Sequence, residues 1–213
     1  MKIEISGRLP REKWLAALGV REKADDDMNG RLDKAEAELL TAASPRGVYR
    51  IMDSRDVKTE GESIKRHLEG CGQVAVMAVT LGIGVDNLIR RVQVTDMLEA
   101  VLLDTGASVM TEEACDIFEK EIRNCTDKFT TSRFSPGYGD FPLKLQADMV
   151  RYVDGQRKIG LSVTESSLMI PRKSVTALIG LSDHPVTGSP AGCEECMLRD
   201  KCILRKEGKF CGD

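Results

Sequence analysis

The segment that most constrains the fold is a nearly continuous apolar run in the first half of the chain. From Gln73 to Leu81 it reads QVAVMAVTL, with a glycine on each side at positions 72 and 82. A β-branched, apolar run of this length between glycines predicts a buried strand. Burying it requires a sizeable core, and a chain of 213 residues with 41% hydrophobic and 31% charged residues can build one.

The elements predicted around this strand follow a mixed order. The patterns predict helices over residues 11–18, 32–43, 63–68, 85–124 and 143–152, and strands or extended segments over residues 1–8, 48–52, 129–133, 161–170 and 174–182. Asn29-Gly30 predicts a turn, and the small residues 106–108 in the longest helix predict a close approach by another element. Because strands and helices do not alternate regularly, the order favours the α+β class.

Charge and hydropathy argue against two broad function classes. The net charge is −3, from 31 basic and 34 acidic residues, whereas general nucleic-acid binders gather Lys and Arg. The longest near-apolar run, Val74–Val85, has 12 residues, which is too short for a membrane span of about 20. The first five residues do not resemble a secretory signal. We therefore expect a cytoplasmic chain with no nucleic-acid and no membrane partner.

A rigid loop rich in binding groups is predicted at residues 133–142, which read RFSPGYGDFP. Pro136 fixes the backbone, while Gly137 and Gly139 lack a Cβ, so the backbone can touch a ligand directly. Arg133 can hold a carboxylate with two hydrogen bonds, and Tyr138 offers a flat ring and a hydroxyl. These groups suit a zwitterionic or nucleoside-like small molecule. An ordinary Pro-Gly turn beside a surface arginine is the alternative.

Two further motifs follow the loop. Residues 164–171 read TESSLMIP and residues 182–185 read SDHP, which taken alone predict a strand and a turn. No nucleophile–base pair lies near them, and Gly82-Ile83-Gly84 does not complete a dinucleotide-binding fingerprint. The sequence therefore offers no catalytic residue.

In this order and spacing, the three motifs resemble the activation (reactivation) domain of vitamin B12-dependent methionine synthase. The resemblance extends over roughly residues 95–185 and is greatest to short, free-standing relatives, since no cobalamin-binding or homocysteine-binding region is present. It implies a twisted antiparallel sheet with flanking helices that binds S-adenosylmethionine. It also implies a cobalamin-binding partner. In such a system an electron from a flavodoxin-like donor and the methyl group of S-adenosylmethionine restore methylcobalamin after accidental oxidation to cob(II)alamin.

The resemblance also implies roles for residues of the loop. Arg133 would bind the carboxylate of the methionyl group. The backbone at Ser135 and Gly137 would line the site, and Tyr138 would contact the ligand. All four belong to the cofactor-binding set that the resemblance predicts.

One acidic residue on the long helix completes this implied set. It would hold the amino group of the ligand, and Glu112 is the residue matched to it, with Glu113 as its rival. The reacting atoms belong to the methyl donor and the corrin, so the chain would position them. We do not expect it to be catalytic alone.

A cysteine-rich tail follows the last motif. Cys193, Cys196, Cys202 and Cys211 have the spacing Cys-x2-Cys-x5-Cys-x8-Cys. Four thiols this close in sequence can bind one zinc ion or one iron–sulfur cluster. Free thiols and a disulfide are the alternatives. The other three cysteines, at positions 71, 115 and 125, are expected to be small core residues.

The Gly-, Ser- and Pro-containing stretch 187–192 predicts a linker. It divides the chain into an activation domain-like unit over residues 1–186 and a tail over residues 187–213. Three functions stay open: a reactivation component that binds S-adenosylmethionine, an adaptor for another corrinoid protein, and an electron-transfer module acting on a corrinoid methyltransferase. Arg133 and Tyr138 favour the first, the segment after Pro185 the second, and the tail the third.

Overall fold

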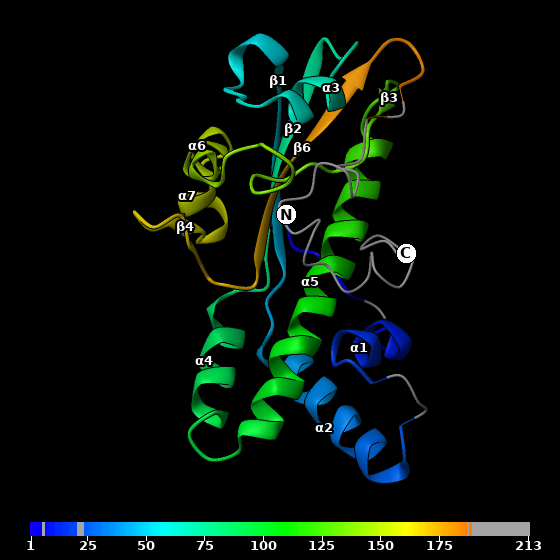
Figure 1. Cartoon of the computed structure of the whole chain (residues 1–213), viewed down its shortest axis with the longest axis vertical. Helices are drawn as coiled ribbons and strands as arrows, with labels where there is room; N and C mark the ends of the chain where they lie inside the picture. The colour runs from blue at the N-terminus through cyan, green and yellow to red at the C-terminus, as the bar shows by residue number, and fades with distance from the viewer. Residues whose placement is uncertain (6, 21–23, 187, 189–213) are drawn as a thin grey trace.

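The computed structural model describes residues 1–5, 7–20, 24–186 and 188, and Figure 1 shows a sheet flanked by helices. The sheet has the strand order β1–β2–β6–β3, and each neighbouring pair is antiparallel. Its strands are β1 (Arg46–Asp53), β2 (Gln73–Thr80), β6 (Ser174–Ser182) and β3 (Phe129–Thr130). A two-stranded sheet pairs β4 (Ser162–Val163) with β5 (Met169–Ile170). The predicted α+β class with an antiparallel sheet and flanking helices is confirmed.

Strand β2 is buried on both faces. Val74 and Val76 point into one hydrophobic cluster, while Ala75 and Met77 point into the other. Side chains of a strand alternate between the two faces of its sheet, so both sets must be apolar when both faces are covered. This explains why the run shows no polar alternation in the sequence.

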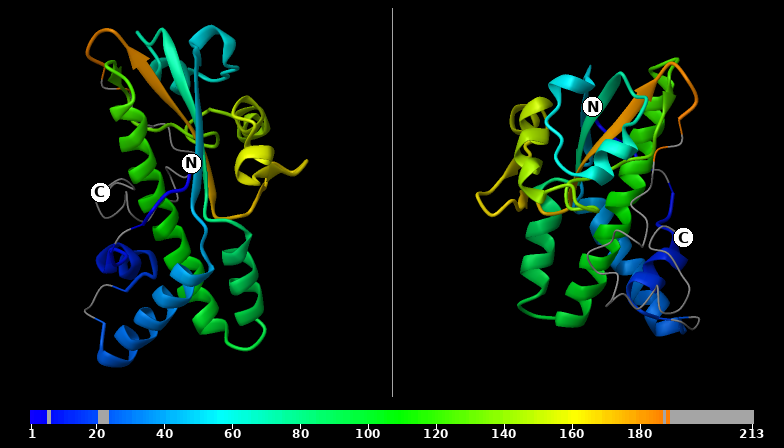
Figure 2. Two further views of the ribbon diagram at one scale, coloured as in Figure 1. Left: turned by 180° about the vertical axis from the view of Figure 1, so that it is seen from behind. Right: turned by 45° about the horizontal axis from the view of Figure 1, so that its top comes forward.

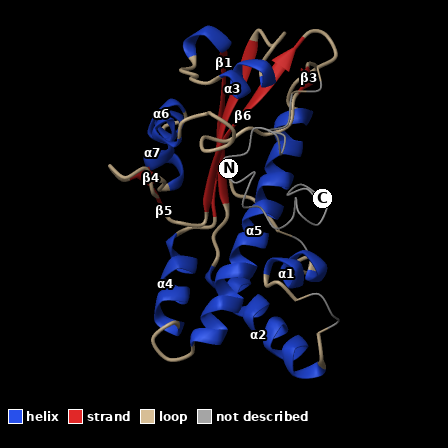
Figure 3. Ribbon diagram, in the orientation of Figure 1, coloured by secondary structure: helices blue, strands red, loops and turns tan. Residues whose placement is uncertain are grey.

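Two groups of helices provide the cover (Figures 2 and 3). One face packs against α1 (Arg11–Ala17), α2 (Asp26–Ala42), α4 (Ile83–Val92) and α5 (Met97–Asn124). The other packs against α3 (Glu62–His67), α6 (Gln146–Tyr152) and α7 (Gly155–Ile159). The short helical turns η1 and η2 span Ser54–Asp56 and Leu143–Leu145. Within the described part of the chain, no helix is long and apolar enough to cross a membrane.

Two sequence predictions about helices are wrong for the same physical reason. The single helix predicted over residues 85–124 is two helices, because the Asp96 side chain accepts a hydrogen bond from the Glu99 N–H at 3.0 Å and starts α5 afresh. The predicted turn at Asn29-Gly30 lies inside α2, because Asp25 caps that helix earlier by accepting from the Met28 N–H at 2.8 Å.

Three predicted extended segments are shorter than expected. Residues 161–170 form the β4–β5 hairpin, whose turn is fixed by Ser167 at φ 63° and by the Leu168 N–H, which donates to Thr164 Oγ1 at 3.1 Å. Of the described residues in the strand predicted over residues 1–8, only Lys2 forms a β-bridge, an isolated one with Arg46. Strand β3 covers two of the five residues predicted as extended. The sequence patterns also missed α7.

Gly106 allows α1 to approach α5 closely, as the small residues 106–108 predicted. A Cβ at this position would overlap the ring of Trp14. The Trp14 side chain is fully buried, and its Nε1–H donates to the Leu102 carbonyl oxygen at 3.2 Å. The close approach predicted from the small residues 106–108 is therefore confirmed, and the element that packs there is α1.

A pair of glycine-to-alanine substitutions tests this contact. Apart from its chain neighbours and the backbone of its own helix, no described atom lies within 4 Å of a Cβ placed at Gly30 of α2, so Gly30→Ala is expected to stabilise the fold by up to about 1 kcal/mol through helix propensity. Gly106→Ala makes the same change in α5 but is expected to destabilise the fold by about 1–3 kcal/mol, because the ring must move. Equilibrium urea unfolding measures both. If the two substitutions changed the free energy of unfolding in the same direction, the close packing of Trp14 on Gly106 would be contradicted.

Candidate ligand-binding site

The loop at residues 133–142 is a tight turn with its own hydrogen bonds. The Ser135 carbonyl oxygen accepts from the Tyr138 N–H at 3.1 Å, and Gly137 adopts φ +98°, a conformation that glycine tolerates best. The Gly137 N–H donates to the Phe141 carbonyl oxygen at 2.8 Å. The N–H of Gly137 is therefore used within the loop, and a ligand approaching there meets the Cα of the glycine.

Two contacts fix the loop to the rest of the fold. Phe134 is buried and exchanges two backbone hydrogen bonds of 2.9 Å with Leu178, near the middle of β6. The Asp140 carboxylate accepts from the N–H groups of Glu62 and Ser63 at 2.6 and 2.9 Å, at the start of α3. These two bonds, the first above all, lower the pKa of Asp140. The loop is held at both ends, which suits a preformed binding surface.

Arg133 lies against a row of three carboxylates on α5. Its Nη1 is 2.8 Å from Asp116 Oδ1 and 2.9 Å from Glu119 Oε2, and its Nη2 is 3.2 Å from Glu112 Oε2. Burial works to lower the pKa of Arg133, but the hydrogen bond to Asp116 and the surrounding acidic groups raise it overall. Arg123 also pairs with this row, with its Nη2 2.6 Å from Glu119 Oε1, so two guanidinium groups face three carboxylates and the cluster has a formal charge of −1.

The two acidic candidates of the sequence analysis lie on different sides of α5. Glu112 contacts Arg133, as described, and its side chain is 59% exposed. Glu113 pairs instead with Lys13 of α1, with Nζ and Oε1 3.0 Å apart. The structure thus brings Glu112 and Arg133 together and places Glu113 away from the loop.

Tyr138 presents its ring at the surface of the loop. The residue is 60% exposed, and its ring lies edge-on to that of Phe134 with centroids 6.3 Å apart. A flat ring in this position can stack on a planar ligand group. Ser135 is half-buried beside it.

Two residues of the cluster, Asp116 and Glu119, are not among those predicted from the sequence. Their spacing from Glu112 is i+4 and i+7, which places all three on one face of a helix. That pattern is visible in the sequence. What the sequence does not show is that a loop more than a dozen residues further along brings Arg133 back onto this face.

The other two motifs lie at opposite ends of β6. The β4–β5 hairpin precedes its first residue, Ser174, and the SDHP motif begins at its last residue, Ser182. The nine residues of β6 separate these two motifs by roughly 26 Å. The loop at residues 133–142, called the Arg133 loop below, pairs with β6 between the two motifs, through a bridge to Leu178. The three motifs share one strand and do not gather around one pocket.

The cysteine tail lies outside the described residues. Within the described residues, no group of three or more His, Cys, Asp or Glu side chains is arranged to hold a metal ion. Cys71 and Cys115 are buried as predicted, and burial raises the pKa of the Cys115 thiol to about 12. The same prediction is wrong for Cys125, which is exposed at the C-terminal end of α5.

Comparison with known families identifies the chain. The family model described as the activation domain of vitamin B12 dependent methionine synthase matches residues 63–186. The chain belongs to this family. The matched segment contains α5, the Arg133 loop and both later motifs, so the resemblance that the motifs indicated is confirmed.

A solved structure of the same kind supports the fold. The crystal structure of the MetH reactivation domain bound to AdoHcy is similar with a TM-score of 0.55 and 18% sequence identity. The alignment covers 96% of this chain and 78% of that one. No match was found among curated proteins. The activation-domain architecture thus extends to segments that the family match does not cover.

Proposed function

We propose that this chain binds S-adenosylmethionine at the Arg133 loop and acts as the reactivation component of a cytoplasmic B12-dependent methionine synthase. The observation that carries the proposal is the Arg133–Glu112 pair beside a rigid Pro-Gly loop in an activation-domain chain. The similar MetH reactivation domain is bound to AdoHcy, the product that remains when S-adenosylmethionine loses its methyl group. That complex supports a ligand of this class.

The charges of the cluster suit this ligand. S-adenosylmethionine carries a sulfonium, an ammonium and a carboxylate, so it needs one cation and a surplus of negative charge. Arg133 and the three carboxylates of α5 provide both. Glu112 is the most exposed of the three and makes the longest contact with Arg133. We infer that the ligand carboxylate displaces Glu112, which then accepts the ligand ammonium.

In the proposed system, the chain binds and orients the methyl donor. The corrin is carried by a cobalamin-binding methionine synthase or related corrinoid protein, and one electron comes from a flavodoxin-like donor. Since both reacting centres belong to the ligands, the isolated chain is not expected to turn over.

The test is a calorimetric titration of the anaerobically purified chain with S-adenosylmethionine, with ATP as the control ligand. Glu112→Gln is expected to raise the Kd roughly five- to tenfold, which is less than the loss of a buried charged hydrogen bond, because the side chain is largely exposed. The matched variant Glu113→Gln is expected to leave the Kd within about twofold, because Glu113 faces Lys13. No binding to folded protein, or a larger effect of Glu113→Gln, would refute the assignment.

A second candidate function is electron transfer to, or docking on, another corrinoid methyltransferase, and the four tail cysteines favour it. We propose that the tail binds one zinc ion or one iron–sulfur cluster. Cys196→Ser is expected to remove most of the bound metal, measured as iron and zinc by elemental analysis. Cys125→Ser, outside the tail, is the control and is expected to retain it. Equal metal content in the two variants would rule out the tail site.

A further inference from the structure

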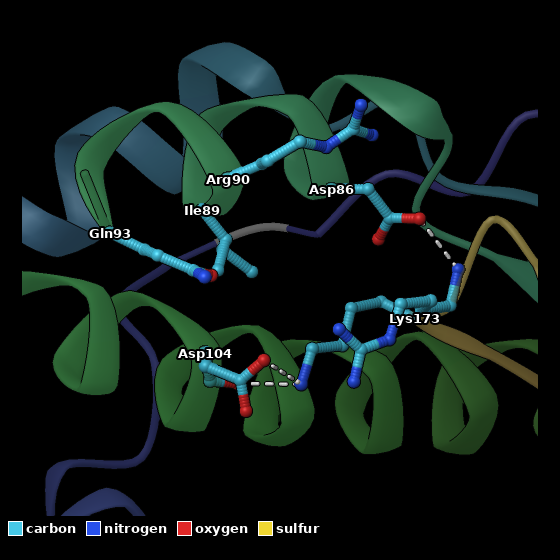
Figure 4. Close-up of a pocket in the computed structure, with 7 residues that line it drawn as sticks. Asp86, Ile89, Arg90, Gln93, Asp104 and Lys173 are labelled. Atoms are coloured by element: carbon cyan, nitrogen blue, oxygen red, sulfur yellow. Dashed lines mark hydrogen bonds and ion pairs between the residues drawn. The ribbon is translucent and has the colours of Figure 1, made fainter. Parts of the chain in front are cut away.

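A cleft between α4 and α5 lies apart from the Arg133 loop. It has a volume of about 280 Å³. Helix α4 contributes Asp86 and Arg90, α5 contributes Asp104, and the turn that leads into β6 contributes Arg172 and Lys173 (Figure 4). Charged side chains from three separate elements therefore converge on one cavity.

The two carboxylates of the cleft are used to hold the turn in place. Asp86 Oδ2 accepts from the Arg172 N–H at 2.8 Å, which ties the turn to α4. Lys173 Nζ is 3.0 Å from Asp104 Oδ1 and also donates to the Asp104 carbonyl oxygen and to Ser108 Oγ, at 2.8 and 2.9 Å. The Lys173 side chain is only 14% exposed. These bonds hold the turn against both α4 and α5, and the guanidinium groups of Arg90 and Arg172 take no part in them.

Among the residues that the structure describes, the two arginine side chains have no acidic partner. No hydrogen bond or ion pair joins the Arg172 guanidinium to any other residue that the structure describes. The Arg90 guanidinium donates to the neutral Asn87 side chain at 3.2 Å. Three cations against two carboxylates give the cleft a formal charge of +1. A guanidinium has a planar fork of donors whose geometry matches phosphate oxygens.

We propose that this cleft binds the phosphate group of a small hydroxylated molecule. Arg172 and Arg90 hold the phosphate, while the Gln93 amide and the second oxygen of Asp86 face its hydroxyl groups. The cavity has the volume of roughly nine water molecules, which leaves room beyond a phosphate ion. Glu112 lies about two turns further along α5 than Asp104, so this site and the Arg133 site are separate.

The test is an NMR titration of the ¹⁵N-labelled chain with inorganic phosphate and with ribose 5-phosphate, at constant ionic strength maintained with chloride. Both probes are expected to give saturable shifts of the amide signals of residues 86–93, 172 and 173. Ribose 5-phosphate is expected to bind at least threefold more tightly. Arg172→Gln is expected to weaken both at least tenfold without changing the affinity for S-adenosylmethionine.

Arg157→Gln is the matched control, since Arg157 of α7 is also exposed but pairs with Asp154, the residue before that helix. It is expected to bind both probes like the parent chain. Shifts that do not saturate, or equal losses in the two variants, would overturn the site. Equal affinities for phosphate and ribose 5-phosphate would overturn the part of the proposal that concerns the hydroxyl groups.

Discussion

Replacing Arg133 with alanine is expected to weaken the binding of S-adenosylmethionine by about 1.5–3 kcal/mol, the scale of a lost charged hydrogen bond. This corresponds to a Kd roughly 10- to 150-fold higher. The substitution removes the cation proposed to hold the ligand carboxylate and leaves Glu112 and Asp116 without their guanidinium partner, while Arg123 still pairs with Glu119. Calorimetric titration measures the change, and thermal unfolding checks that the variant is folded at the temperature used.

Two further variants make this result specific. Arg133→Lys retains the charge but loses the planar fork, so its Kd is expected to lie between those of the parent chain and the alanine variant. Lys13→Ala also removes a cation paired to α5, but from Glu113 on the other side of the helix, and is expected to leave the Kd unchanged. An alanine variant of Arg133 with the parent affinity would show that Arg133 does not contact the ligand.

The largest loss of stability is expected from Trp14→Ala, at about 3–5 kcal/mol. The Trp14 ring is fully buried between α1 and α5 and packs against Gly106. Its removal leaves a cavity and also leaves the Leu102 carbonyl oxygen without the Nε1–H donor. Equilibrium urea unfolding followed by far-UV circular dichroism gives the free energy of unfolding.

Trp14→Phe provides the comparison for this prediction. It retains an aromatic ring against Gly106 but loses the indole donor, so its loss should be clearly smaller than that of alanine. If Trp14→Ala lowers the free energy of unfolding by less than about 1 kcal/mol, Trp14 is not a principal core contact between α1 and α5. Because Trp14 lies away from the Arg133 loop, neither variant should alter the Kd for S-adenosylmethionine while the chain is folded.

The features that could be predicted from the sequence are those fixed by local chemistry. The apolar run that became β2 is recognisable because both of its faces are buried, which removes every polar alternation. The turn at residues 135–138 is recognisable because proline and glycine restrict the backbone wherever they occur. The antiparallel arrangement of the sheet came from the resemblance, since no local pattern specifies which strands pair.

The features that escaped prediction depend on competition or on distant contacts. Residues 161–170 contain strand-forming residues, but Thr164 and Ser167 turn the chain back after two residues of pairing. The break between α4 and α5 follows from the Asp96 cap, a short signal that the long helical periodicity obscured. The cluster around Arg133 required the fold itself, because its carboxylates come from a helix and its guanidinium from a later loop.

The pairing of β1 with β2 has a practical consequence for expression. The family match begins at residue 63, whereas β1 ends at Asp53 and pairs with β2 along its whole length, from Arg46 opposite Thr80 to Asp53 opposite Gln73. A fragment cut at the start of the family match would turn β2, an apolar strand buried on both faces, into an unprotected sheet edge, which is a template for aggregation. Soluble fragments of this protein should therefore keep the segments before residue 63.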